Sequence, residues 1–141
     1  MLYAIHKLRV SFAFTGADGT IEWSTEKKDD NSSLHHESGV IIVGQPGIYY
    51  VHSYLSYHND SDRYPFEPHM PRQHTLHLKR SNDQKTNPIL HDVMLGCDVK
   101  SASQLAGVFK FESGDAIHVR SSHAHVIDHE FAPNHFSIHL L

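Results

Sequence analysis

The run GIYYVHSYLSY at residues 47–57 constrains the fold of this chain more than any other segment. Its apolar and aromatic side chains alternate as in a β-strand, where successive side chains point to opposite faces. A strand at the surface of a monomeric domain usually buries one face and exposes the other to water. Here both faces carry large side chains: Tyr49, Val51, Ser53 and Leu55 share one face, and Ile48, Tyr50, His52 and Tyr54 share the other. We therefore expect one face to pack on the core and the other to pack on a second protein surface.

Strand-like segments separated by turn residues run through the whole chain. Short alternating or β-branched runs end in clusters such as GADG, GQPG and ESGD, and helical periodicity is nearly absent. A length of 141 residues suits a single domain,. The pattern predicts one all-β domain over residues 1–141, a jelly roll, sandwich or small barrel, with strands near 3–14, 20–25, 38–43, 47–57, 74–80, 89–95, 106–112, 115–120 and 134–141.

Charge and hydropathy argue against two classes of partner. The formal net charge of −4 provides no basic field to attract nucleic acid or an anionic membrane,. No apolar run reaches the roughly 18 residues that a membrane helix needs, and no secretory signal opens the chain. Asn31 and Asn59 each begin an N-x-S triplet. These triplets predict N-glycosylation sites of an extracellular protein.

Four motifs occur in a recognisable order: Trp23, GVIIVGQPGIYYVHSYLSY at 39–57, LAGVFKFESGDAIHV at 105–119 and HFSIHLL at 135–141. Together they resemble the tumour necrosis factor (TNF) ligand family. Its members carry a Trp near the first loop, an aromatic central strand, a Gly-containing penultimate hairpin and a hydrophobic last strand. This chain departs from the usual pattern at Ala106 and Ser137, where members carry Gly, and at His52, where they carry Tyr.

The resemblance implies a jelly roll of about ten strands that assembles as a homotrimer. It implies a cytokine that clusters Cys-rich TNF-receptor-family receptors in the grooves between subunits and so triggers signalling. It further implies the extracellular part of a type II membrane protein, or a secreted product, with the stalk and membrane segment outside this chain. The trimer interface would include Ile48, Tyr50, His52, Tyr54, Gln104, His135 and His139. Because clustered imidazolium ions repel one another, we expect such a trimer to weaken below about pH 6.5.

Receptor contacts are expected from the loops that flank the subunit groove. In this chain the resemblance places those loops at 17–37, 58–73, 81–88 and 121–134. The candidate receptor-binding residues are Lys27, Lys28, Tyr64, Phe66, Asp83, Lys85 and Asp128.

The single cysteine, Cys97, cannot form an internal disulfide,. It is a buried apolar thiol, an intermolecular partner or a metal ligand. In a death-inducing member of the TNF family, a similar PIL strand leads to a lone Cys, and three copies hold zinc on the trimer axis. The resemblance therefore implies zinc at Cys97 as an optional cofactor, and no other cofactor is required.

Two alternative functions fit parts of the chain. His123 and His125 would share one face of a strand and precede Glu130, which is similar to the motif that holds iron or manganese in cupin enzymes,. The glycines of that motif are replaced here by Ile117 and Ser137. The globular head of complement-type collagens, a sister family with the same fold, is the other alternative. No phosphate-binding loop or nucleophile elbow occurs, so we expect a binding protein and not an enzyme.

Overall fold

The computed structural model describes residues 7–15, 20–28, 33–58, 71–94, 100–122, 127 and 134–141, with the backbone alone considered at 7–15, 22–28 and 100. These residues form ten strands: β1 (Lys7–Thr15), β2 (Ile21–Lys28), β3 (His35–Glu37), β4 (Val40–Ile42), β5 (Gly47–His58), β6 (Arg72–Lys79), β7 (Asn87–Met94), β8 (Lys100–Phe111), β9 (Ala116–Ser121) and β10 (His135–Leu140). Within the described ranges, no helix is long and apolar enough to cross a membrane.

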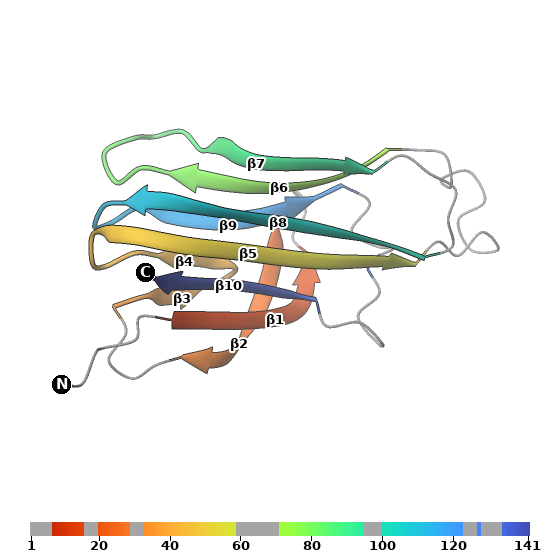
Figure 1. Ribbon diagram of the computed structural model, residues 1–141, viewed down its shortest axis with the longest axis horizontal. Helices are drawn as coiled ribbons and strands as arrows, with labels where there is room; N and C mark the ends of the chain where they lie inside the picture. Colours follow the sequence, from red (N-terminus) through yellow and green to blue (C-terminus); the bar gives the residue numbers. More distant parts are fainter. Residues whose placement is uncertain are drawn as a thin grey trace.

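The strands form two five-stranded antiparallel sheets. Sheet A has the order β2-β1-β10-β5-β8, and sheet B has the order β3-β4-β9-β6-β7. The C-terminal strand β10 lies between β1 and β5 and pairs with both (Figure 1). Neighbours that are distant in sequence, together with two packed sheets, are the jelly-roll arrangement. The predicted all-β fold and the predicted strand near 134–141 are therefore confirmed.

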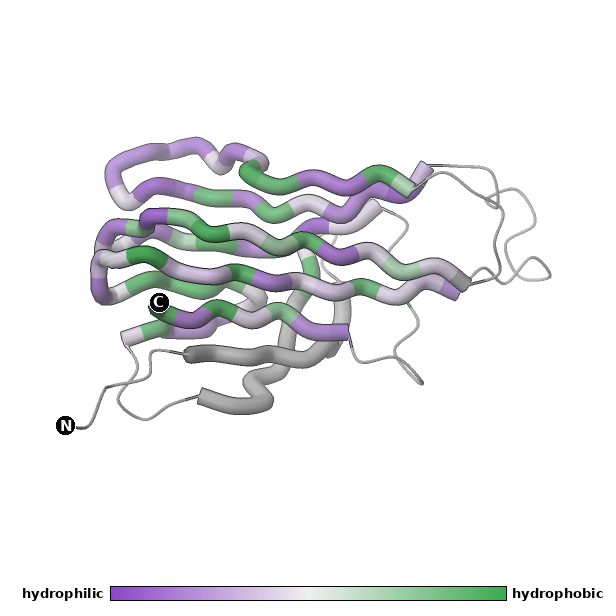
Figure 2. The backbone as a smooth tube through the Cα atoms, viewed as in Figure 1, coloured by the Kyte–Doolittle hydropathy of each residue, from purple (hydrophilic) through white to green (hydrophobic). Residues whose placement is uncertain are grey.

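The core lies between the inner faces of the two sheets, as in other β-sandwiches. Hydrophobic and hydrophilic residues alternate along strands such as β5 (Figure 2). Every second residue of β5 from Tyr49 to Tyr57 is buried, so one face of this strand points into the core. Sheet A contributes fully buried Tyr49, Leu55, Phe111, Phe136 and Ile138, and sheet B contributes Ile41, Leu76, Ile117 and Val119.

Two of the predicted strand bounds were wrong. The strand predicted over 38–43 is the shorter β4, because Ser38 and Gly39 both have positive φ and form a two-residue turn. This turn joins β4 in a hairpin to β3, which was not predicted. Positive φ at both central residues matches the right-handed twist of paired strands. Strand β8 begins at Lys100 and not near residue 106, because it pairs with β5 along its whole length, from Gly47 opposite Phe111 to His58 opposite Lys100.

The ESGD turn between β8 and β9 connects two loops at one end of the sandwich. Gly114 has φ +90°, and a Cβ added there would lie 2.8 Å from the Cβ of Ser81. The buried Asp115 carboxylate accepts hydrogen bonds from Arg80 Nη1 at 2.6 Å, from Ser81 N at 3.1 Å and from Glu112 N at 2.9 Å. Charge-assisted bonds of this kind are the stronger ones in proteins. The Gly-Asp pair of this motif therefore has a structural role.

Candidate functional site

The outer face of sheet A carries the side chains that the sequence assigned to a second protein surface. Along β5, Tyr49, Val51 and Leu55 are buried, whereas Ile48 is 44% exposed. Tyr50, His52 and Tyr54 are half-buried on the same side as Ile48. On β10, Phe136 and Ile138 are buried and His135 and His139 point outward, while Leu140 packs only at the edge of the core. The predicted division of the 47–57 strand into two faces is therefore confirmed.

Aromatic rings form a continuous row across β5 and β10 on this face. Their cross-strand pairs are His135 with Tyr54 and His139 with Tyr50. The centroids of Tyr50 and His139 are 5.3 Å apart, and those of His52 and His135 are 4.8 Å apart. The rings of Tyr54 and His135 are nearly parallel, with centroids 6.0 Å apart. These distances lie in the favourable range for aromatic pairs, so the row is a pre-organised surface.

Hydrogen bonds indicate which ring nitrogen of His52, the central histidine of the row, carries the proton in the neutral form. His52 Nε2 lies 3.1 Å from Gln104 Oε1, which can only accept, so Nε2 of His52 carries a proton,. His52 Nδ1 lies 2.8 Å from His135 Nε2. In neutral His52 the Nδ1 atom is then the acceptor, and His135 donates to it. The bond is lost if both rings are protonated, because neither facing nitrogen then has a lone pair.

Two further residues of this face were missed from the sequence. Val108, on β8 opposite Tyr50, is 57% exposed, and Leu141 is 66% exposed beside Ile48, whose carbonyl accepts its N–H at 2.8 Å. Counting by twos from the buried Phe111 would have placed Val108 outward with Gln104. We name the outer-face surface of sheet A the aromatic face; it comprises Ile48, Tyr50, His52, Tyr54, Gln104, Val108, His135, His139 and Leu141.

Only some of the candidate receptor-binding residues fall in described parts of the chain. Asp83 and Lys85 are exposed in the loop between β6 and β7, where Asp83 Oδ1 accepts a hydrogen bond from Lys85 N at 3.2 Å. The Asp83 carboxylate therefore stabilises its own turn. The backbones of Lys27 and Lys28 pair with Arg9 and Leu8 in sheet A. The remaining candidates, Tyr64, Phe66 and Asp128, lie outside the described residues.

The proposed metal and modification sites also lie outside the described residues. They are Cys97 for zinc, His123, His125 and Glu130 for the cupin-like alternative, and Asn31 and Asn59 for glycosylation. Among the residues that the structure does describe, no group of three or more His, Cys, Asp or Glu side chains could hold a metal ion. His74 and His77 lie on opposite faces of β6, one in the core and one outside, as the alternation predicts.

A buried polar chain, which the sequence did not reveal, links the two sheets through His74. The Oγ atoms of Ser53 and Ser103 each lie 2.9 Å from a ring nitrogen of His74, and Ser103 Oγ donates to Asp92 Oδ2 at 2.5 Å. Because Ser103 uses its proton on Asp92, Nδ1 of His74 must donate to Ser103, and Nε2 must accept from Ser53. Ser53 and His74 are both 0% exposed. No substrate reaches this Ser–His pair, so it holds the sheets together and is not a catalytic pair.

A comparison with protein families matches most of the chain to one family. Residues 21–141 match the TNF (Tumour Necrosis Factor) family. No individual curated protein matches the chain significantly. The family match includes every strand from β2 to β10, which is all of sheet B and all of sheet A except β1. The chain belongs to the TNF family.

Proposed function

We propose that this protein is a homotrimeric TNF-family cytokine whose aromatic face forms the interface between subunits. The proposed trimer binds Cys-rich receptors of the TNF-receptor family in the grooves between its subunits and clusters them to trigger signalling. It acts outside the cell, as a membrane-anchored or released ectodomain, and carries out no catalysis.

The single observation that supports the trimer best is the uncovered aromatic face. Ile48, Val108 and Leu141 are among the most exposed large hydrophobic side chains of the described residues, and all three lie on this one face. They adjoin the row of Tyr and His rings, which pack on one another and include the hydrogen bond between His52 and Gln104. Contiguous apolar and aromatic surface rimmed by polar groups is typical of a protein interface.

Receptor recognition is proposed at the loops that border such a groove. Asp83 and Lys85 lie in an exposed loop at the end of sheet B and are available to a partner. Lys27, Lys28, Tyr64, Phe66 and Asp128 stay candidates for the same surface. We retain zinc at Cys97 and glycosylation at Asn31 and Asn59 as proposals to be tested by metal analysis and mass spectrometry.

A pair of matched substitutions tests the interface. Val108 on sheet A and Val93 on β7 of sheet B are both exposed, at 57% and 45%. Val108→Asp should convert the trimer into monomers, because a carboxylate cannot be buried in an apolar interface without a partner. Val93→Asp should leave the oligomer intact. Sedimentation velocity measures both; loss of assembly in neither variant, or equally in both, would overturn the assignment of the aromatic face.

A further inference from the structure

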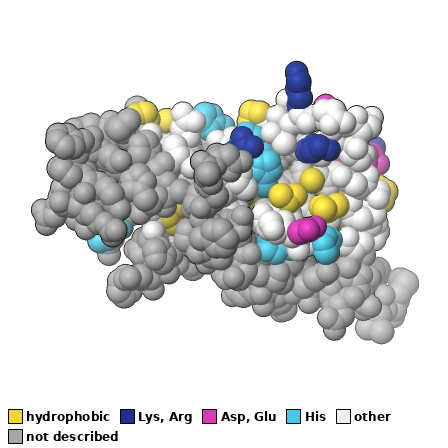
Figure 3. All heavy atoms as spheres, turned by 180° about the vertical axis from the view of Figure 1, so that it is seen from behind, with side chains coloured by type: hydrophobic (Ala, Val, Ile, Leu, Met, Phe, Trp, Pro, Cys, Tyr) yellow, Lys and Arg dark blue, Asp and Glu magenta, His cyan; other side chains and the backbone are white. Residues whose placement is uncertain are grey.

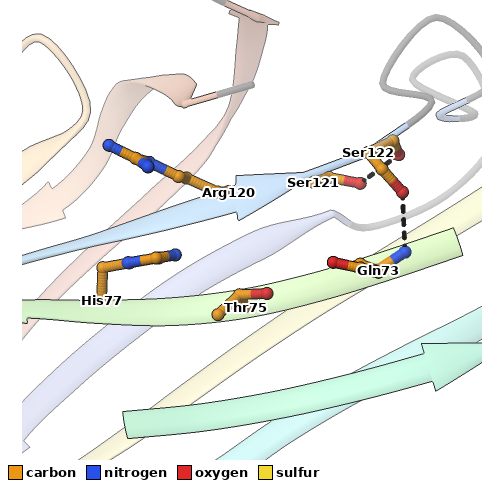
Figure 4. Close-up of a pocket in the computed structure, with 6 residues that line it drawn as sticks. All are labelled: Gln73, Thr75, His77, Arg120, Ser121 and Ser122. Atoms are coloured by element: carbon orange, nitrogen blue, oxygen red, sulfur yellow. Dashed lines mark hydrogen bonds between the residues drawn. The ribbon is translucent and has the colours of Figure 1, made fainter. Parts of the chain in front are cut away.

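The outer face of sheet B contains a small polar pocket that has no role in the proposed trimer. It has a volume of about 290 Å³ and is lined by Gln73, Thr75, His77, Arg120, Ser121 and Ser122. Figure 4 shows these side chains along the adjacent strands β6 and β9. The volume is at the low end of the roughly 300–1,000 Å³ of ligand pockets, which suits a small ligand.

Part of the lining is already occupied by internal hydrogen bonds. Ser121 Oγ lies 2.6 Å from Tyr57 OH and donates to Ser122 O at 2.8 Å, so it is a structural wall. Thr75 and His77 are not part of this wall. Thr75 is 9% exposed, and His77 Nδ1 is a buried atom without a hydrogen-bond partner among the described residues. A buried polar atom in this state costs free energy unless a ligand or water satisfies it.

The lining of the pocket includes one cationic side chain. Arg120 lines it, and none of the acidic side chains that the structure describes does so. Burial lowers the pKa of His77, and the positive charges of Arg120 and His91 lower it further. Seen from behind, the molecule shows histidine side chains beside Lys or Arg side chains and also beside an Asp or Glu side chain (Figure 3). A cationic pocket with hydroxyl and imidazole donors is complementary to an anion.

We propose that this pocket binds a small tetrahedral oxyanion, sulfate or phosphate, through the Arg120 guanidinium with donors from Thr75 and His77. The donors come from two neighbouring strands, β6 and β9, so a group with several oxygens can accept from both strands, which suits an oxyanion better than a planar carboxylate. The pocket lies within one chain, so the proposal does not depend on the proposed trimer.

Titration with inorganic sulfate at constant ionic strength, followed by amide and side-chain NMR, tests the proposal. Saturable shifts are expected at Gln73, Thr75, His77 and Arg120, with acetate and chloride producing none that saturate. Arg120→Gln should weaken binding at least about tenfold, and Thr75→Val, which removes only the hydroxyl, should weaken it several-fold. Methyl phosphate distinguishes the free ion from an ester carried on a larger ligand: saturation at the same residues identifies an ester, and saturation by the inorganic ions alone identifies the free ion.

Lys79 provides the matched control, since it lies on the same strand and face but outside the lining. Lys79→Gln should change the sulfate affinity by less than about twofold. If the shifts do not saturate, or if Lys79→Gln weakens binding as much as Arg120→Gln, the attraction is non-specific and the proposal is overturned. Because Thr75→Val changes no charge, a folded Thr75→Val protein with unchanged affinity would also contradict it, even if Arg120→Gln failed to fold.

Discussion

His74 should make the stability of this protein fall steeply in mild acid. Burial, partly opposed by the Asp92 carboxylate and assisted by His52, lowers the pKa of His74 from 6.5 to about 4. In the unfolded chain the ring titrates near 6.5. Between these two values the unfolded state binds a proton that the folded state does not bind. Stability is therefore lost as the pH falls through this window, and the loss stops growing below about pH 4.

The size of the effect follows from the pKa displacement. At about 1.4 kcal/mol per pKa unit, the change from 6.5 to about 4 corresponds to a loss of about 3 kcal/mol in the free energy of unfolding,. His74→Gln is the comparison, because glutamine can donate and accept in place of the ring but does not titrate. Denaturant unfolding at equal protein concentration measures the difference in the free energy of unfolding between wild type and His74→Gln. We expect this difference to change by about 3 kcal/mol from pH 7 to pH 4.

Effects of the other histidines are shared by both proteins and cancel in this difference. A difference that stays constant over the whole pH range would refute the reasoning. Direct NMR titration of the His74 ring provides a second check. A ring that titrates between pH 6 and 7 would show that the buried Ser53–His74–Ser103 chain does not exclude the charged form.

Two other predictions concern the aromatic face and the Gly-Asp turn. Sedimentation between pH 8 and pH 5 tests the expectation that a trimer with histidines at its interface weakens in acid, because clustered imidazolium ions repel one another; His52→Tyr, which removes one of these histidines, should resist this, and an unchanged wild-type trimer at pH 5 would contradict it. Asp115→Asn should lower the free energy of unfolding by about 2 kcal/mol, because it weakens the buried bonds to Arg80 and two backbone N–H groups,. The exposed Glu112→Gln should cost less than about 0.5 kcal/mol, and equal effects would argue against the turn as a structural anchor,.

Most of the fold could be predicted because period-two alternation depends only on local residue order. The alternation in 47–57 correctly assigned the side chains of residues 48–55 to the two faces of β5, and HFSIHLL was correctly read as a strand. The hairpin at Ser38 and Gly39 was missed because the short polar run HHE before this dipeptide does not read as a strand. The early start of β8 was missed because SASQ reads as a loop. It is a strand only because β5 is long enough to pair with it.

The candidate site was predictable where it depends on strand faces and unpredictable where it depends on contacts between distant segments. Tyr50, His52 and His135 could be assigned to one surface from alternation and family resemblance. The hydrogen bonds from His74 to Ser53 and Ser103 join residues separated by 21 and 29 positions. The pocket at Arg120 likewise requires the register between β6 and β9. No local sequence pattern specifies the register between these two strands.

The proposed trimer is tested most directly by the molar mass of the protein in solution near pH 7.5. Light scattering coupled to size-exclusion chromatography should return about 48 kDa, the mass of three chains of 16.0 kDa each,. The value should hold on dilution through the micromolar range. A mass of one or two chains at these concentrations would contradict the assignment of the aromatic face as a threefold interface.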